Sequence, residues 1–457
     1  MTSLSELSLP QLRAEFNGRL IAPGDPGYDQ ARTVVMGGID RRPAAIVRPA
    51  NADEAARVVN LARNTGLELA VRSGGHSSAG HSVTDGGIVL DLANLKAIDI
   101  DVEGRTAWAQ TGLTAGEYTT AAAEHGLATG FGDTGSVGIG GITLGGGIGY
   151  LSRRFGLTID DVLAAEVVTA DGQLLRVDAD NHPDLFWAIR GGGGNFGLVT
   201  RFQYRLHEVS AAYGGILLLP ATVDTVLGFL EAADAAPEEL STIANVMSAP
   251  PMPFIPAEHH GKLVLFAMMC YSGPVEQGEQ VFAPFRALGT PLADMLRPIK
   301  YPEMYPPEPE GYHPTAVSRN FFVDTVDRSG AETILDQIER SDAPMRAVQL
   351  RVLGGAIARV SPDATAYAHR QRKIMVNVAS FYTSPEDKPV RQRWVDGLVT
   401  ALRRPGDTDA YVNFVGDEGE EGVRSAYPKA TFERLAAVKR QYDPDNLFRL
   451  NQNIRPA

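Results

Sequence analysis

The segment 132–149 limits what this chain can fold into more than any other stretch, because nine of its eighteen residues are glycine. Glycine is disfavoured inside both helices and strands, so this composition does not favour either element. A flexible linker would combine glycine with serine, whereas Val, Ile and Leu alternate with glycine here. A dinucleotide fingerprint is also a poor match, since Thr143 stands where the third glycine of G-x-G-x-x-G would be. The pattern predicts backbone that lies directly against a flat or extended ligand.

An earlier glycine-containing turn, the first glycine turn of the chain, indicates the same kind of ligand. Residues 67–71 are typical of a short apolar strand, and the turn 73–76, Ser-Gly-Gly-His, follows it. Adjacent glycines allow positive φ and close approach of the backbone to a bound group. Consecutive N–H groups in such a turn can form an anion-binding nest suited to a pyrophosphate, with His76 held close to it. An isolated turn of this kind is usually only a turn, but a third glycine-rich segment, 191–197, favours the ligand-binding interpretation.

Composition excludes several other classes of protein. At 457 residues the chain can form two or three domains with sizeable cores. Its formal charge of −13 argues against nucleic acid or an anionic membrane surface as a partner. The single cysteine, Cys270, excludes an internal disulfide and a cysteine-rich metal site. His259 and His260 would point to opposite sides of an expected strand, so we predict no metal site. Without a visible signal peptide or membrane span, a cytoplasmic location is expected.

The order of elements predicts an α+β fold. A strand at 43–49, a helix at 53–65 and the strand at 67–71 form a β-α-β start on a mixed sheet. A strand pair is expected across 164–176, and the composition changes after His207. Further strands are expected at 214–219, 263–269, 348–352 and 374–382. The last two strands carry polar side chains that could form the floor of a pocket, although each is individually more often structural than catalytic: Gln349, Arg351, Asn377 and Tyr382.

Four ordered motifs resemble one known family. They are RSGGHSSAGHS at 72–82, GSVGIGGITLGGGIGYLSRRFGLTIDDVLAAEVVTADG at 135–172, DLFWAIRGGGGNFGLVT at 184–200 and YDPDNLFRLNQNI at 442–454. Together they resemble the berberine-bridge-enzyme-like FAD-linked oxidases, part of the vanillyl-alcohol-oxidase superfamily with PCMH-type FAD-binding domains. The resemblance covers nearly the whole chain. It implies an FAD-binding domain at 1–206, a central α/β substrate-binding domain with an antiparallel sheet at 207–410, and a segment at 411–457 that returns to the FAD domain.

The resemblance also implies the cofactor and the residues that hold it. His76 corresponds to the histidine whose ring is joined to the flavin 8α-methyl carbon. Such a bond makes the flavin a stronger oxidant and prevents its loss. The residues that the resemblance places around FAD are Arg72, Ser73, Gly74, Gly75, His76, Ser77, Gly80, His81, Thr134, Val137, Gly138, Gly140, Gly141, Gly145, Gly147, Asp161, Val199, Asn413 and Asn451.

Two positions near the expected flavin bear on its chemistry. Thr134 occupies the position at which many relatives have a second, cysteinyl tether, so we expect a single covalent bond through His76. Val137 matches the oxygen-gate position of the family. A valine there resembles members that let O2 reach the flavin, which favours an oxidase over a dehydrogenase.

The expected catalytic base is altered. Phe414 replaces a tyrosine that in the family often removes the hydroxyl proton of the substrate, and Leu353 replaces a partner tyrosine. If 411–414 is a strand, as in the family, Tyr411 faces the opposite side from residue 414. A substrate that needs no strong base, such as a neutral amine, is therefore favoured. Tyr411, Asn377 and Gln349 are the candidate catalytic residues.

Together these observations predict an FAD-dependent oxidase. A carbon of a small-molecule alcohol or amine would pass hydride to flavin N5, and O2 would be reduced to H2O2. Oxidative cyclisation, oxygenation or dehydrogenation of a biosynthetic intermediate are the alternatives. A non-enzymatic flavin-binding protein is disfavoured by the intact motif around His76. Neither the substrate nor the oligomeric state follows from the sequence.

Overall fold

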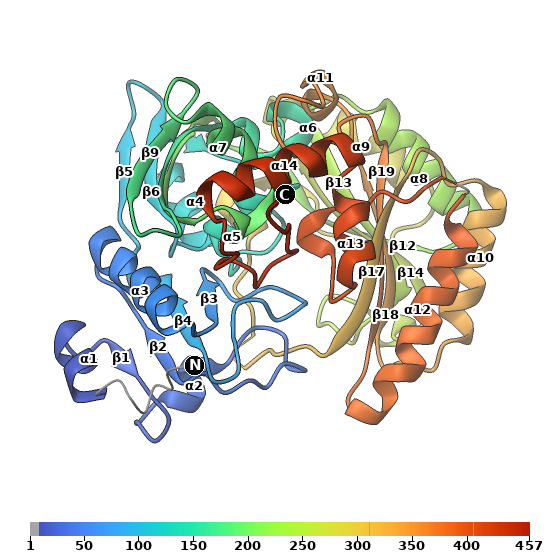
Figure 1. The fold of residues 1–457 in the computed structure, drawn as a ribbon. Coiled ribbons are helices and arrows are strands. Elements are labelled where there is room, and N and C mark those ends of the chain that lie inside the picture. The colour runs from blue at the N-terminus through green and yellow to red at the C-terminus, as the bar shows by residue number, and fades with distance from the viewer. Residues whose placement is uncertain (1–8, 310, 405) are drawn as a thin grey trace.

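The computed structural model describes residues 9–309, 311–404 and 406–457. The start of the chain, where no signal peptide was visible in the sequence, lies outside the described residues. The chain has the predicted α+β fold (Figure 1). Two regions lie side by side: one contains the small sheets formed by strands β1 to β11, and the other is built around one large sheet. The last helices of the chain return across the first region (Figure 1).

A small mixed sheet holds the first glycine turn. Its strand order is β1-β2-β4-β3, with β2, β4 and β3 parallel and β1 antiparallel to β2, as expected for a β-α-β start. The strands are β1 (Leu20–Ile21), β2 (Ala45–Val47), β3 (Leu69–Arg72) and β4 (Ile88–Asp91). The helices around them are α1 (Leu9–Glu15), α2 (Tyr28–Arg32) and α3 (Ala52–Thr65). Asn51 caps α3, since its side chain accepts a hydrogen bond from the Glu54 N–H at 2.9 Å.

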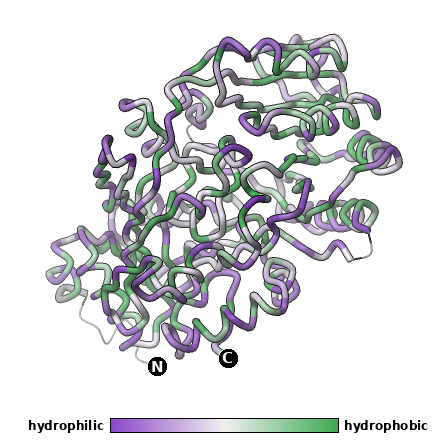
Figure 2. Tube along the Cα trace, turned by 90° about the horizontal axis from the view of Figure 1, so that it is seen from above, coloured by the Kyte–Doolittle hydropathy of each residue, from purple (hydrophilic) through white to green (hydrophobic). Residues whose placement is uncertain are grey.

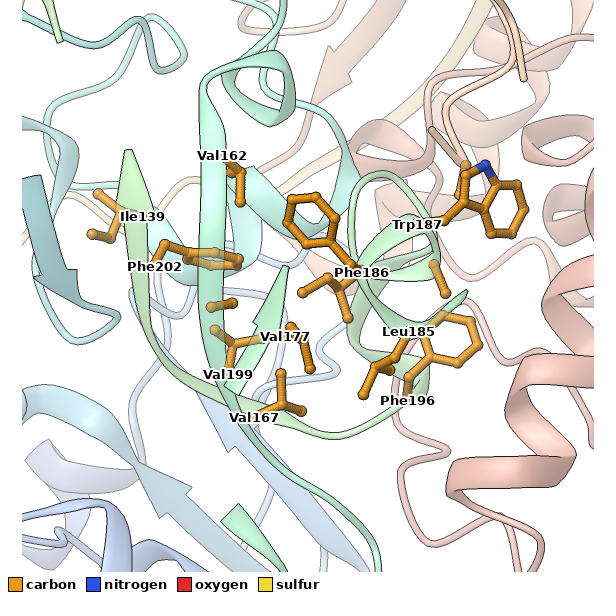
Figure 3. Packing of buried hydrophobic residues seen from close by; sticks show 14 of the residues in the cluster. Ile139, Val162, Val167, Val177, Leu185, Phe186, Trp187, Phe196, Val199 and Phe202 are labelled. Atoms are coloured by element: carbon orange, nitrogen blue, oxygen red, sulfur yellow. The ribbon is translucent and has the colours of Figure 1, made fainter. Parts of the chain in front are cut away.

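An antiparallel five-stranded sheet completes the first region and contains the predicted strand pair. Its order is β5-β6-β10-β8-β9. The strands are β5 (Ile98–Asp101), β6 (Thr106–Gln110), β8 (Val162–Val168), β9 (Leu174–Asp178) and β10 (Leu198–Arg205), with a two-stranded sheet of β7 (Leu127–Ala128) and β11 (His207–Glu208) beside it. The helices are α4 (Ala115–Ala123), α5 (Ile139–Gly145), α6 (Ser152–Phe155) and α7 (Pro183–Ala188). Apolar side chains of α5, α7 and the strands pack into one core (Figure 3).

The glycine-rich segment differs from its prediction, because its middle part forms α5 despite the poor helix propensity of glycine. Close packing explains the composition. A Cβ added to Gly74 would collide with the backbone of Gly138, and one added to Gly138 would collide with Ser73. Buried Ile139 anchors the helix in the core. Glycine therefore lets the two predicted ligand-binding segments lie backbone against backbone, and tertiary packing overrides propensity.

The second region is an eight-stranded antiparallel sheet. Its order is β15-β12-β14-β13-β18-β19-β17, and β16 pairs with β12. The strands are β12 (Ala212–Pro220), β13 (Leu240–Ser248), β14 (Leu263–Tyr271), β15 (Ala293–Asp294), β16 (Arg297–Ile299), β17 (Ala316–Val323), β18 (Arg346–Val352) and β19 (Ile374–Phe381). The outer face is covered by α8 (Val223–Ala235), α10 (Arg328–Arg340) and α12 (Lys388–Leu402), with α9 (Gly278–Arg286) beside α8 (Figure 1). The other face of the sheet is turned towards the first region.

Three local predictions are wrong. His259 ends a 3-10 helix (Ala257–His259) rather than lying on a strand, and the ring of His260 lies 2.9 Å from the Ile255 carbonyl. Segment 412–414 is also a 3-10 helix (Val412–Phe414), so the rings of Tyr411 and Phe414 lie together, 5.4 Å apart, instead of on opposite sides. The end of the chain was expected to dock on the first region as a strand over residues 446–454, but its backbone there is irregular. These segments are short, and their conformation is set by tertiary contacts.

The remaining helices are α11 (Ala356–Arg359), α13 (Gly419–Ala426) and α14 (Lys429–Tyr442). Hydrophobic and hydrophilic stretches alternate along the trace (Figure 2). The buried hydrophobic residues form a separate core in each of the two regions. Among the described residues, no helix is both long and apolar enough to cross a membrane.

Candidate functional site

A cavity of about 560 Å³ lies between the two regions. Its walls come from the first glycine turn, the glycine-rich segment, strands β18 and β19, and the C-terminal segment. Most of the residues singled out from the sequence line it, although they come from distant parts of the chain: Ser73, Gly74, Gly75, His76, Ser77, His81, Thr134, Val137, Gly138, Gly140, Gly141, Val199, Gln349, Asn377, Tyr411, Asn413 and Asn451. The fold therefore brings the three candidate catalytic residues to the same space as the three glycine segments.

Five predicted cofactor residues lie outside this lining, and each has a structural contact instead. Arg72 donates to the Ala31 carbonyl at 2.6 Å and to Asp91 at 3.0 Å. Asp161 lies 2.7 Å from the His207 ring. Gly80, Gly145 and Gly147 are tight packing positions: a Cβ on Gly80 would press on Ile39, one on Gly145 would collide with Asn413, and one on Gly147 would collide with Thr158.

The cavity has unused polar groups suited to an extended, phosphate-bearing ligand. The N–H groups of His76, Ser77 and Ser78 have no acceptor among the described residues. Three consecutive amides of this kind can bind an anion. The buried side-chain oxygens of Asn377 and Asn451 also have no partner in the described part of the chain. Buried polar groups are nearly always hydrogen-bonded, and these two oxygens, which belong to lining residues, are free to accept hydrogen bonds from a ligand.

Glycine keeps part of the wall open. A Cβ added to Gly141 or Gly194 would meet no atom within 4 Å, so both positions border free space in the cavity. The turn also needs glycine for its conformation, since Gly75 has φ of 76°. A dinucleotide cofactor fits this cavity for three reasons: the free N–H groups of residues 76–78, the open wall at Gly141 and Gly194, and the length of the lining.

His76 is the first member of a hydrogen-bonded series. Its Nε2 lies 2.9 Å from Ser136 Oγ, which in turn lies 2.6 Å from the carboxylate of Glu308. Burial lowers the pKa of His76, while the nearby Glu308 charge opposes this effect. Burial and then the Arg41 charge lower the pKa of His81 to about 4. Both imidazoles are therefore neutral at pH 7.

The sheet side of the cavity carries one ion pair. Gln349 and Asn377 are cross-strand neighbours, and Arg351 lies on the same face as Gln349, two residues along β18. Arg351 donates to Asp133 at 2.6 Å and to the Gln349 side-chain oxygen at 2.8 Å. The Gln349 amide then donates to Asn245 at 3.0 Å. Asp133 is the only carboxylate among the described lining residues, and Arg351 neutralises it.

The Tyr411 hydroxyl is held by three hydrogen bonds in the wall of the cavity. Its hydroxyl oxygen accepts from the Gly147 N–H at 2.9 Å, the Ile148 N–H at 3.3 Å and the Asn413 amide at 2.9 Å. Burial raises the pKa of Tyr411 above that of a free phenol, so the side chain is uncharged at neutral pH. Phe414 lies beside it, and the Arg351 guanidinium is 5.1 Å from the centre of the Phe414 ring.

Sequence reasoning missed three residues of this site. They are Asp133 and Ser136, which lie in the glycine-rich segment, and Glu308, the partner of Ser136. Arg351 was a candidate for the pocket floor, but no pattern marks its pairing with Asp133. Glu308 belongs to the proline-rich stretch 301–314, which indicated either a loop over a pocket or a plain connection and did not mark Glu308 itself. Tyr382, although suggested as a floor residue, does not line the cavity.

Comparison with known proteins shows that two parts of the chain, one in the N-terminal half and one at the C-terminal end, match known families. The family described as "FAD binding domain" matches residues 43–178, and the family described as "Berberine and berberine like" matches residues 410–455. The chain is 31% identical to (R)-6-hydroxynicotine oxidase of Paenarthrobacter nicotinovorans over 99% of each chain. It is 30% identical to the FAD-linked oxidoreductase YgaK of Bacillus subtilis (strain 168), over 97% of this chain and 98% of that one. The crystal structure of 6-hydroxy-D-nicotine oxidase from Arthrobacter nicotinovorans superimposes with a TM-score of 0.83 at 28% identity, over 96% of this chain and 98% of the other.

Proposed function

The chain belongs to the berberine-bridge-enzyme-like FAD-linked oxidoreductases, and we propose on this premise that it is an oxidase acting on a C–H bond next to nitrogen or oxygen in a small molecule. FAD, when bound, supplies the hydride acceptor at flavin N5. The observation that carries the proposal is the single cavity in which the glycine segments, His76 and the polar face of β18 and β19 meet. Substrate and cofactor would then share one space, as hydride transfer requires.

The protein's own residues would hold the cofactor in place. The free amides of 76–78 would bind the pyrophosphate, and the side-chain oxygen of Asn451 would accept a hydrogen bond from the same ligand. His76 would be joined to the 8α-methyl carbon. Thr134 lines the cavity at the position of the second tether and cannot form a thioether, which supports a single covalent bond.

An amine carbon is the preferred site of oxidation. An alcohol must lose its hydroxyl proton as hydride leaves, whereas a neutral amine can use its nitrogen lone pair. The cavity lining described here offers no free carboxylate, and Tyr411 remains a neutral phenol. The relative named (R)-6-hydroxynicotine oxidase takes, by its name, a substrate with amine nitrogen, which supports the same choice.

O2 is the proposed electron acceptor and H2O2 the proposed product. Val137 lines the cavity and leaves more room than leucine would for O2 to approach. Two alternatives remain. Dehydrogenation with another acceptor would consume substrate without accumulating peroxide, whereas oxidative cyclisation would release peroxide and give a product with a new ring bond. The division into domains at 206 and 410 and the roles of individual residues belong to the same proposal.

The first test is the visible spectrum of the purified protein, followed by acid precipitation. We expect a yellow protein whose pellet stays fluorescent. His76→Ala should give a colourless pellet with any FAD in the supernatant. His125→Ala, which removes an exposed histidine at the end of α4, is the control and should match the wild type. A yellow supernatant with a white wild-type pellet would remove the tether from the proposal, and a colourless protein would contradict the oxidase itself.

A further inference from the structure

Three side chains from three separate parts of the chain form a continuous hydrogen-bonded series. His76 ends the first glycine turn, Ser136 precedes α5, and Glu308 lies in the segment between β16 and β17. Ser136 Oγ is 2.9 Å from His76 Nε2 and 2.6 Å from Glu308 Oε2. The carboxylate therefore comes from the second region of the fold, while the imidazole and the hydroxyl come from the first.

The hydrogen positions in this series follow from the chemistry of the groups. An ionised carboxylate can only accept, so Ser136 donates its single hydrogen to Glu308. Ser136 Oγ can then only accept from His76, which places a hydrogen on Nε2. A neutral imidazole carries one N–H, so the other nitrogen, Nδ1, holds the free lone pair. No described residue hydrogen-bonds to Nδ1, which leaves it available for reaction.

We propose that Ser136 and Glu308 direct the covalent attachment of FAD, by fixing the His76 tautomer and by accepting the proton that attachment releases. This inference rests on the proposed histidyl tether. The bond that forms joins Nδ1 to the 8α carbon of FAD, and one C–H bond at that carbon breaks. Two electrons and two protons are released, one proton from this carbon and one from Nε2. O2, the proposed acceptor, takes both electrons and both protons and leaves as H2O2.

The arrangement matches what each stage of this reaction needs. Alkylation of Nδ1 makes the imidazole cationic until Nε2 gives up its hydrogen. Ser136 can receive that hydrogen while passing its own to Glu308, so the charge never stays on the ring. The negative charge of Glu308 also favours the cationic ring before the transfer, because an opposite charge nearby stabilises the charged form of a titratable group. Burial, which lowers the pKa of His76, keeps the attacking nitrogen unprotonated beforehand.

The experiment separates FAD binding from FAD attachment. Full-length wild type, Ser136→Ala, Glu308→Gln and Glu308→Asp are produced under riboflavin limitation and then mixed with FAD in air. Total bound FAD is measured from visible absorbance after desalting, and covalent FAD is measured from fluorescence in denaturing gels over time. Glu303→Gln is the matched control, since this exposed carboxylate in the preceding turn pairs with Arg297 and has no contact with His76.

We expect Ser136→Ala and Glu308→Gln to attach FAD about 10-fold more slowly or worse, as for loss of a general base, with total binding within about two-fold of the wild type. Glu308→Asp should recover part of the rate, and Glu303→Gln should attach FAD at the wild-type rate. A role in folding alone would lower total binding and the melting temperature together. That outcome, or attachment at the wild-type rate in both variants, would overturn the relay.

A second measurement tests the tautomer directly. NMR of the flavin-bearing peptide from the digested wild type should show the bond at Nδ1, and a bond at Nε2 would overturn the inference. Failure of the proposed tether looks different. In that case the wild-type protein would hold no covalent FAD, or His76→Ala would still hold it, whatever the Ser136 and Glu308 variants do.

Discussion

At the scale of single residues, the proposed chemistry depends on Phe414. Its ring borders the cavity, beside Tyr411 and 5.1 Å from the Arg351 guanidinium. Sequence comparison could identify this position because it lies in a motif with fixed spacing. It could not show that the Arg351 guanidinium lies over the ring, because Arg351 comes from β18 in the second region. The residue type was readable from the sequence, and its electrostatic surroundings were not.

Phe414→Tyr should therefore add a base that the native site lacks. The Arg351 charge would favour the ionised phenol, since an opposite charge nearby lowers the pKa of an acid. We expect alcohol oxidation to rise about 10-fold or more and to increase with pH, while amine oxidation changes little. Peroxide release on a panel of paired amines and alcohols measures this. Phe381→Tyr is the control: it lines the same cavity, six residues along β19 from Met375, the strand partner of Arg351. Equal gains in both variants would show that added polarity, not a base, is responsible.

At the scale of elements, long periodic segments were predictable and short ones were not. Helix α3 and the strands β8, β9, β18 and β19 follow from their patterns, with bounds close to those expected. The conformation of the C-terminal tail could not be predicted from its pattern, because the tail packs on the first region as irregular backbone held by tertiary contacts. Lys439 on α14 lies fully buried and donates to the carbonyls of Asn195 and Phe448, at 2.7 and 2.9 Å, and to Asp443 at 2.6 Å. One lysine therefore fixes the residues that follow the helix.

Lys439→Met should release this tail from the cavity. The variant leaves the Asp443 carboxylate buried without a cation, which typically costs about 3–5 kcal/mol. Phe448 and Asn451 line the cavity, so FAD retention should fall as well. Urea unfolding and flavin absorbance after desalting measure the two effects. Lys429→Met, at an exposed position on the same helix, should change neither. The double variant Lys439→Met/Asp443→Leu should recover part of the stability, and no recovery would mean that the lost hydrogen bonds matter more than the charge.

At the scale of the whole molecule, the site exists only where the two regions meet. Each region has its own core, and its sequence patterns specify it separately. The cavity requires β18 and β19 to face the glycine segments, and no local pattern encodes that orientation. This is why the glycine side of the cavity could be predicted from motifs, whereas the sheet side remained a set of individually weak candidates. The buried pair Arg351–Asp133 is one contact that joins the two sides.

A double-mutant cycle on this pair tests whether it holds the two regions in register. Arg351 is 4% exposed and Asp133 19%, so each single variant, Arg351→Met or Asp133→Asn, leaves a largely buried charge without its partner. We expect each to lower the free energy of unfolding by about 2–4 kcal/mol, near the lower end for buried pairs because Asp133 keeps some contact with water. The double variant removes both charges, so its loss of unfolding free energy should be smaller than the sum of the two single losses by about 1–3 kcal/mol.

Chemical denaturation of the FAD-bound protein gives the energies, and KM in each variant reports whether the cavity keeps its shape. Because Arg351 also orients Gln349, Arg351→Met should raise KM more than Asp133→Asn does. Losses that add within about 0.5 kcal/mol would mean that the two charges act independently and that the regions are held together by apolar packing alone.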